Sequence, residues 1–266
     1  MGSRTRGTIA SPPVLKNREE AIYISMHIPK TGGNTFRAHL KEVFGDDVCF
    51  VYRSQWQFVD IYTPTPMMRL YRSFRAMKSG FRDRSQLRLT DRCIHGHFRA
   101  ETYLALLPEA SAMTWVRDPV ERIMSQYHYW KRRPFPGHSV CNFLVRNNLG
   151  PVEFAEIDVM RNLQCRYFNT KTVEDFGFIG ITEQFNACLA GFYRFVGAQL
   201  KQPLNAGAKT NQARNTNPNK NASSRYEVDP AVRARIVALN SKDYKLYDQA
   251  VERALKAGMF TDLNTK

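Results

Sequence analysis

A short apolar segment, a glycine-containing loop and an amphipathic helix follow one another near the start of the chain, and this order most constrains the fold. Residues 21–26 are rich in β-branched and aromatic side chains and end at a turn, which predicts a buried strand. Phe36 and Leu40 then recur at helical spacing, with Asn34 or Thr35 placed to cap the first turn. This order favours an α/β fold.

The loop between the predicted strand and helix has the features of an anion-binding site. Gly32 and Gly33 lack side chains, so backbone N–H groups can approach an anion at the positive end of the helix dipole. The lysine precedes the glycines, whereas the Walker A loop for ATP has lysine after the last glycine. An ordinary glycine-rich turn is the simpler alternative. The predicted anion-binding residues are Lys30, Thr31, Gly32, Gly33, Asn34 and Thr35.

A second segment repeats the pattern of a strand followed by a helix. Residues 112–116 predict another buried strand, and Pro119 suits the first turn of the helix that follows. Arg117 stands at the strand end and Ser125 lies two turns into the helix. A guanidinium can bind a phosphate through two parallel N–H bonds, and a hydroxyl adds one more. Read alone, the segment is better explained as a salt-bridged helix start.

Two histidines lie one residue apart between these segments. In a strand, residues i and i+2 face the same side, so His95 and His97 are expected to point into one site. Imidazole, with an ordinary pKa of about 6.5, suits a general base near neutral pH. The alternatives are structural histidines or a metal site. We predict no metal, because no Cys-x-x-Cys or His-Glu-x-x-His companion is present.

Together these motifs resemble a known family. The Pro-Lys-Thr-Gly-Gly loop is similar to the 5′-phosphosulfate loop of sulfotransferases that use 3′-phosphoadenosine 5′-phosphosulfate (PAPS). The longer segment from His27 to Phe36, the pair Arg117/Ser125 and the His-Gly-His sequence look most like the heparan 2-O-sulfotransferase-like family (sulfotransferase family 2). The resemblance implies a P-loop-kinase-like sulfotransferase fold, in which a central parallel sheet is flanked by helices within a single domain.

The resemblance also implies roles for these residues. The loop would hold the 5′-phosphosulfate, with Lys30 stabilising charge on the departing phosphate oxygen. Arg117 and Ser125 would grip the 3′-phosphate of PAPS. Asn215 lies in a segment where relatives often close a loop over the nucleotide. Asn34 departs from the family, because relatives more often have a hydroxyl residue there.

The same resemblance assigns the two histidines. The second histidine of His-Gly-His is the favoured base in the family, so His97 is the predicted catalytic base. His95 is predicted to help His97 or to contact the acceptor.

The formal charge of +15 indicates an anionic partner. Basic residues spaced three apart form a predicted helical stripe, which could hold an anionic or carbohydrate acceptor; a solvated surface is the alternative. Charge alone also suggests a nucleic-acid binder, but the aromatic-plus-basic modules of such proteins are not visible, so no nucleic-acid partner is predicted. The stripe consists of Arg69, Arg72, Arg75 and Lys78.

Residues 1–20 are predicted to form a flexible arm and residues 21–260 the sulfotransferase domain. Within it, a strand at 178–181 feeds a helix from 183 to about 200, and one helix runs from 229 to about 258. No apolar stretch approaches the ~20 residues of a transmembrane helix. Five widely spaced cysteines indicate free thiols in a reducing cytosol, as expected for a cytoplasmic bacterial member.

The sequence therefore predicts a PAPS-dependent O-sulfotransferase that acts on a carbohydrate or glycoconjugate and needs no metal. A nucleotide or small-molecule kinase of related topology is the first alternative. Against the kinase, the chain lacks the Gly-Lys-Ser/Thr sequence, and Asp118 is the only candidate magnesium ligand at a strand end. A non-catalytic polyanion binder is the second alternative.

Overall fold

A parallel β-sheet forms the centre of the molecule, as predicted. The structure is a computed structural model that describes residues 21–52, 87–88, 90–134, 139–197 and 226–263. The described strands form one five-stranded sheet in the order β2-β3-β1-β4-β5, with every pairing parallel. They are β1 (Tyr23–Met26), β2 (Val48–Val51), β3 (Cys93–Gly96), β4 (Ser111–Val116) and β5 (Phe178–Ile181).

The register of the sheet brings three loops to one edge. β1 lies between β3 and β4, and Met26 at its end is paired with Gly96 on one side and Thr114 on the other. Because the strands are parallel, the residues that follow them emerge at the same edge of the sheet. Those residues are His27, His97 and Arg117.

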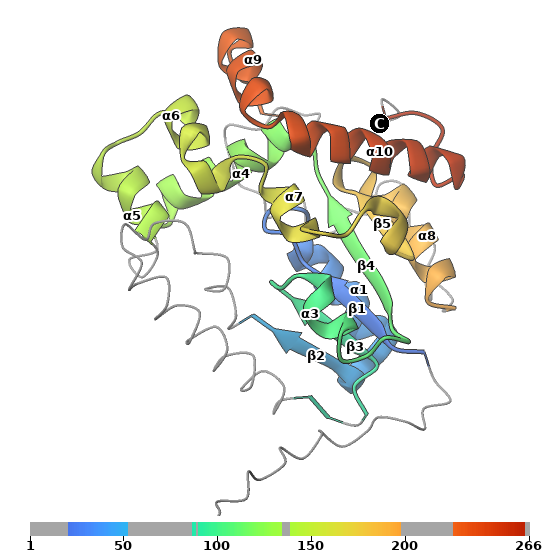
Figure 1. Ribbon diagram of the computed structural model, residues 1–266. Coiled ribbons are helices and arrows are strands. Elements are labelled where there is room, and N and C mark those ends of the chain that lie inside the picture. The colour runs from blue at the N-terminus through green and yellow to red at the C-terminus, as the bar shows by residue number, and fades with distance from the viewer. Residues whose placement is uncertain (1–20, 53–86, 89, 135–138, 198–225, 264–266) are drawn as a thin grey trace, which may run out of the picture.

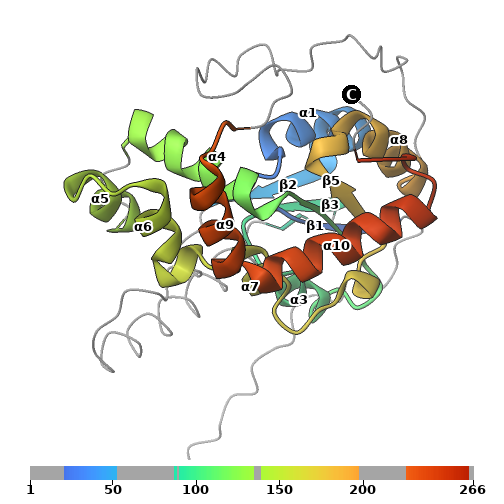
Figure 2. The ribbon, with the colours of Figure 1, turned by 90° about the horizontal axis from the view of Figure 1, so that it is seen from above.

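Helices cover both faces of the sheet. The predicted apolar face of α1, with Phe36 and Leu40, is buried against it. Figure 2 shows α1 and α8 on one face and α3, α7 and α10 on the other. Their bounds are α1 (Gly33–Phe44), α3 (Ala100–Leu104), α7 (Leu163–Phe168), α8 (Phe185–Phe195) and α10 (Ser241–Lys256).

Four further helices lie beside the sheet and form a lobe with its own apolar cluster (Figure 1). Ile123, Phe154 and Ile236 are fully buried within this cluster. The helical lobe consists of α4 (Pro119–Arg132), α5 (Ser139–Arg146), α6 (Pro151–Glu156) and α9 (Pro230–Leu239). Short 3₁₀ turns complete the described elements: η1 (Gly45–Asp47), η3 (Asp158–Met160), η4 (Val173–Asp175) and η5 (Thr182–Gln184).

The structure corrects two predicted elements. The single helix expected over 229–258 is divided at Asn240 into α9 and α10. Asn240 is fully buried, and its side-chain oxygen accepts a hydrogen bond from the backbone N–H of Asn162 at 2.9 Å. The helix expected from 183 begins at Phe185, after η5. Strand β2 was not predicted.

Several predictions lie outside the described residues. These are the N-terminal arm, the basic stripe Arg69/Arg72/Arg75/Lys78, and Asn215. The five cysteines are all free, with Cys93, Cys141 and Cys188 buried. Of the helices in the described ranges, not one has the length and apolar character needed to cross a membrane.

Candidate active site

The glycine-containing loop holds its shape through backbone conformation. Lys30 and Gly32 both have positive φ angles, 73° and 87°, and the Gly32 carbonyl accepts hydrogen bonds from Thr35 and Phe36 N–H at 3.1 Å. Gly32 is the N-cap of α1, and no side chain caps this helix among the described residues. The expectation that Asn34 or Thr35 caps α1 is therefore wrong, because the helix already starts at Gly33. The first N–H groups of α1 are left to face an anion.

Gly33 is required by the close approach of a histidine ring. A Cβ atom at this position would lie 1.9 Å from Nε2 of His27. Any larger residue would therefore displace either the ring or the start of α1. His27 had no predicted role, although it stands within the motif.

Thr31 contributes to the loop from inside. Its side chain is 1% exposed, and its hydroxyl donates a hydrogen bond to the Ile28 carbonyl at 2.8 Å. The hydroxyl thus stabilises the turn, and the group that Thr31 can offer to an anion is its backbone N–H.

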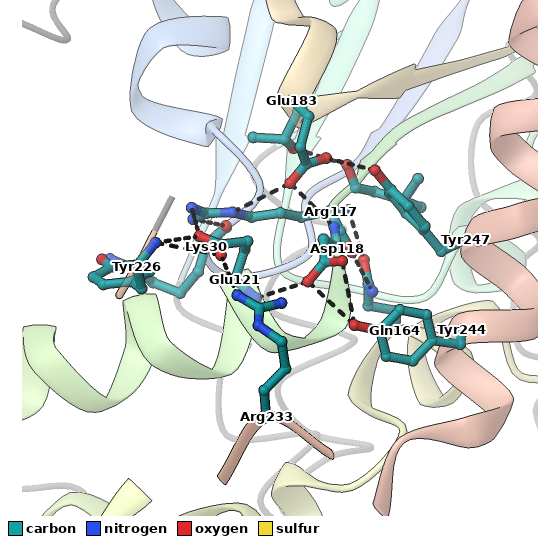
Figure 3. A network of polar contacts seen from close by, with 12 residues as sticks. Lys30, Arg117, Asp118, Glu121, Gln164, Glu183, Tyr226, Arg233, Tyr244 and Tyr247 are labelled. Carbon is teal, nitrogen blue, oxygen red and sulfur yellow. Dashed lines mark hydrogen bonds and ion pairs between the residues drawn. The ribbon is translucent and has the colours of Figure 1, made fainter. Parts of the chain in front are cut away.

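Arg117 joins the second predicted segment to the first. Its Nη1 donates a hydrogen bond to the Lys30 carbonyl at 3.1 Å (Figure 3). The side chain is 10% exposed, and its Nε–H is buried without a hydrogen-bond partner among the described residues. A guanidinium has five N–H donors, so this buried group retains donors for an anion.

The face of α4 supplies the other side of the site. Ser125 is buried two turns beyond Arg117, and Tyr129 lies one turn further along. The Lys30 ammonium lies 4.2 Å from the centroid of the Tyr129 ring, a cation–π contact. Lys30 thus contacts both Arg117, through its carbonyl, and Tyr129 of the helix that also carries Ser125. Tyr129 was not predicted, since its role depends on the loop facing α4.

Two carboxylates flank Arg117. Glu121 Oε2 lies 3.8 Å from Nη2, and Glu183 Oε1 lies 3.7 Å from Nε. Burial raises the pKa of Glu183, and the positive charge of Arg117 opposes that rise. Glu183 also accepts hydrogen bonds from the Asp118 N–H at 3.2 Å and from the Tyr247 hydroxyl at 3.0 Å.

The backbone of Arg117 is held by one buried amide side chain. Gln164 accepts from the Arg117 N–H at 2.9 Å and donates to its carbonyl at 2.8 Å. Gln164 is positioned in turn by Asp243 of α10, whose carboxylate accepts its N–H at 3.1 Å. Arg117 is thus fixed at both its backbone and its side chain.

Asp118 is occupied by structural hydrogen bonds. It is the N-cap of α4, where its carboxylate accepts the Glu121 N–H at 3.0 Å, and it accepts from the Tyr244 hydroxyl at 3.2 Å. This pattern is typical of helix capping. It does not favour Asp118 as the magnesium ligand that a kinase would need.

The geometry of His97 fits a base. Its Nδ1 lies 2.8 Å from the His27 carbonyl oxygen. Because a carbonyl oxygen only accepts, Nδ1 carries the proton and Nε2 carries the lone pair. Burial lowers the pKa of His97 to about 4, although the hydrogen bond to the His27 carbonyl opposes this shift. His97 is therefore neutral at pH 7.

His95 is a core residue. It is 1% exposed, and its Nδ1 lies 2.8 Å from the Ser25 hydroxyl. Burial lowers its pKa to about 3, with a smaller effect of the nearby His97 and Arg37 charges. Because the ring is enclosed, the structure does not favour a direct contact between His95 and an acceptor. The strand alternation nevertheless places it near His97.

His27 connects the two histidines. Its ring stacks on His97 with centroids 4.5 Å apart and on His95 with centroids 5.2 Å apart. The Tyr52 ring meets His97 edge-on at 5.1 Å. The parallel pairing of β1 with β3 places His27 beside His97, so these contacts could be inferred only once the strand order was known. Within the described ranges no three His, Cys, Asp or Glu side chains are grouped as metal ligands.

A comparison with known proteins identifies the family of the chain. Residues 19–249 match the family model described as the sulfotransferase family. No curated protein matches the chain. Two similar solved structures are sulfotransferases. One, from Alicyclobacillus acidocaldarius, is 13% identical and has a TM-score of 0.48, with 90% of this chain and 99% of that chain covered. The other, mouse SULT7A1 complexed with PAP, is 14% identical and has a TM-score of 0.41, with 91% and 90% covered.

The family model spans most of the chain and includes every described residue of the site. The fold is correspondingly the α/β sulfotransferase fold that the sequence resemblance implied. The chain therefore belongs to the sulfotransferase family and is a sulfotransferase.

Proposed function

We propose that this protein is a PAPS-dependent O-sulfotransferase that uses a histidine base. The observation that carries the proposal is the 3.1 Å hydrogen bond from Arg117 to the Lys30 carbonyl. It joins two predicted phosphate-binding segments, 87 residues apart in the sequence, into one continuous site. A donor with phosphate groups at both its 5′ and 3′ positions fits such a site.

The two segments divide the donor between them. The loop at Gly32 and Gly33 offers backbone N–H groups and the helix dipole to the 5′-phosphosulfate. Arg117 offers its remaining N–H groups, and Ser125 its hydroxyl, to the 3′-phosphate. Lys30 leaves the face of Tyr129 and stabilises the negative charge that develops on the departing phosphate oxygen.

His97 accepts the proton of the acceptor alcohol through Nε2. The alcohol oxygen forms a bond to sulfur while the bond between sulfur and the 5′-phosphate oxygen breaks, and the products are a sulfate ester and 3′,5′-ADP. The His27 carbonyl favours this direction of proton transfer, because it accepts a hydrogen bond from Nδ1 both before and after Nε2 is protonated. The two negative phosphate groups of the donor raise the pKa of His97, which makes Nε2 a stronger base.

The acceptor in this proposal is a carbohydrate or another anionic glycoconjugate. The resemblance of His-Gly-His and the phosphate loop to heparan 2-O-sulfotransferase-like enzymes supports it, together with the charge of +15. The five free cysteines support a reducing, cytoplasmic location. Reversing two charges of the predicted basic stripe, Arg72→Glu with Lys78→Glu, should raise the acceptor KM and leave the affinity for 3′,5′-ADP unchanged.

Nucleotide binding gives the direct test. Calorimetry should find that 3′,5′-ADP binds far more tightly than 5′-AMP, and that Arg117→Ala removes the difference. Transfer of labelled sulfate from PAPS to a panel of polysaccharides, glycolipids and small alcohols should then proceed in EDTA. Equal affinities of the wild type for the two nucleotides, or stabilisation by ATP–Mg with none by 3′,5′-ADP, would sink the proposal and favour the kinase alternative.

A further inference from the structure

A carboxylate occupies an unexpected position in the proposed 3′-phosphate site. Glu121 lies on α4, four residues after Arg117, which precedes the helix, and four residues before Ser125, so Glu121 and Ser125 share one helix face. Its carboxylate is 4% exposed and lies 3.8 Å from Arg117 Nη2. A phosphate bound between Arg117 and Ser125 would therefore meet a buried negative charge.

That charge is shared with a second arginine. Arg233 on α9 donates from Nη2 to Glu121 Oε1 at 3.2 Å, and the Tyr226 backbone N–H lies 3.1 Å from Oε2 and 3.3 Å from Oε1 (Figure 3). The Arg233 side chain is 37% exposed to solvent. Glu121 thus lies between two guanidinium groups, one inside the site and one outside.

The other carboxylate beside Arg117 has different partners. Glu183 faces the Asp118 N–H and the Tyr247 hydroxyl, which are neutral donors. Apart from Arg117, only Arg233 gives Glu121 an ion pair among the described residues. Of the two flanking carboxylates, Glu121 is therefore the one whose charge is balanced by a cation from another helix.

We infer that Arg233 is a positioning residue that neutralises Glu121 and so leaves Arg117 available for the 3′-phosphate. The inference rests on the proposed function. With Arg233 removed, Glu121 competes for the Arg117 guanidinium and repels the incoming phosphate. At an effective dielectric constant of about 20, an uncompensated charge at such separations changes a Kd by about tenfold or more.

A matched pair of variants on one helix tests this role. Arg233→Ala should weaken binding of 3′,5′-ADP about tenfold by calorimetry and leave 5′-AMP binding unchanged, because only the former carries a 3′-phosphate. Arg235→Ala is the control: this residue lies two positions along α9 and pairs with Glu156 at 3.0 Å instead. It should leave both affinities unchanged. If Arg233→Ala destabilises α9, Arg233→Gln serves as the second variant and should show the same loss of affinity for 3′,5′-ADP.

Rescue provides the decisive measurement. Adding Glu121→Gln to Arg233→Ala removes the charge that Arg233 balances, so 3′,5′-ADP affinity should return to within about threefold of the wild type. No rescue would overturn the inference and indicate that Arg233 contacts the nucleotide directly. Equal weakening of 5′-AMP would overturn it in favour of a purely structural role. A wild type without preference for 3′,5′-ADP would overturn the proposed function itself.

Discussion

The loop at residues 27–35 and the segment at residues 117–125 both contribute to the proposed anion site, but they are built differently. The loop acts through its backbone: Lys30 and Gly32 adopt positive φ angles, and the start of α1 has no side-chain cap. The second segment acts through side chains, and Arg117 is held by residues from three other parts of the chain.

The two regions therefore differ in whether nearby or distant residues of the sequence determine their conformation. The conformation of the loop follows from a few neighbouring residues, so a change there acts on the loop directly. The orientation of Arg117 depends on carboxylates and amides that come from α7, α10 and η5, so a change far away in sequence reaches it. We expect variants in the two regions to fail in different ways.

The largest effect is expected at the proposed base, His97, which is hydrogen-bonded to the loop backbone at His27. His97→Ala should lower kcat by ~10²–10⁴-fold, the usual contribution of general-base catalysis. Because both phosphate contacts lie on other segments, the Kd for 3′,5′-ADP should stay within about threefold of the wild type. Steady-state transfer kinetics and calorimetry on the same preparation check both values. Near-normal turnover in a folded variant would place the base elsewhere.

A variant in the loop should lose activity because the shape of the loop changes. Gly33→Ala introduces a Cβ where the His27 ring lies, and we expect a fall in kcat/KM of ~10²-fold, typical of a misplacement of about 1 Å. Gly191→Ala is a suitable control, because the atoms nearest to its new Cβ belong to the flexible Met259 side chain at 3.3 Å. That variant should keep its activity. Equal losses in both would remove the distinction between the two regions.

A variant of Arg117 should lose affinity because the hydrogen-bonding groups of its side chain change. Arg117→Lys keeps the charge but loses the planar fork, so 3′,5′-ADP binding should weaken by about 10–100-fold, corresponding to one or two charged hydrogen bonds. 5′-AMP should bind as in the wild type. A lysine variant with wild-type affinity would show that charge alone holds the 3′-phosphate.

A smaller effect should reach Arg117 from α10. Tyr247→Phe removes the hydroxyl that donates to Glu183, which faces Arg117, and should weaken 3′,5′-ADP by about 2–10-fold. Tyr244→Phe makes the same chemical change three residues earlier, but its hydroxyl donates to Asp118, the cap of α4. It should lower the melting temperature and leave the preference for 3′,5′-ADP intact. Identical affinities of the two variants for 3′,5′-ADP would contradict the idea that Glu183 helps to orient Arg117.

The smallest change is expected in the pH profile. Burial lowers the pKa of His97 to about 4, so the base remains neutral as pH falls and is lost only below that value. The kcat/KM for the donor, which reports the free enzyme, should vary less than about twofold from pH 8 to pH 5. His97→Ala should lack any acidic limb. A wild-type limb at pH 6–7 would show that the ring is more solvated than the structure has it.

The two regions also differ in how far sequence predicted them. The strand, the loop and the glycines of the first region were predicted because strand and helix periodicity and the positions of Gly32 and Gly33 are local signals. The pair Arg117 and Ser125 was predicted through the family resemblance. Glu121 and Glu183 were not given roles, because an isolated glutamate carries no signal until the packing of α4 against the C-terminal helices is known.

The histidines illustrate the same limit. Their alternation on a strand was visible, but the burial of His95 and the lowered pKa of His97 follow from β1, β2 and α1 enclosing β3. The role of His27 depends on the order of parallel strands, which periodicity does not encode. The division of the last helix at Asn240 was missed because its cause, a hydrogen bond to Asn162, crosses 78 residues.

The hydrogen bond between Gln164 and Asp243 has a consequence for synthesis on the ribosome. All described strands have been translated once residue 181 is reached, whereas Asp243, which positions Gln164 and through it the Arg117 backbone, is translated more than 60 residues later. A nascent chain can therefore pair its strands before it can orient Arg117. We expect an emerging chain to acquire its sheet first and its affinity for nucleotide last, which delays ligand binding until α10 has left the exit tunnel.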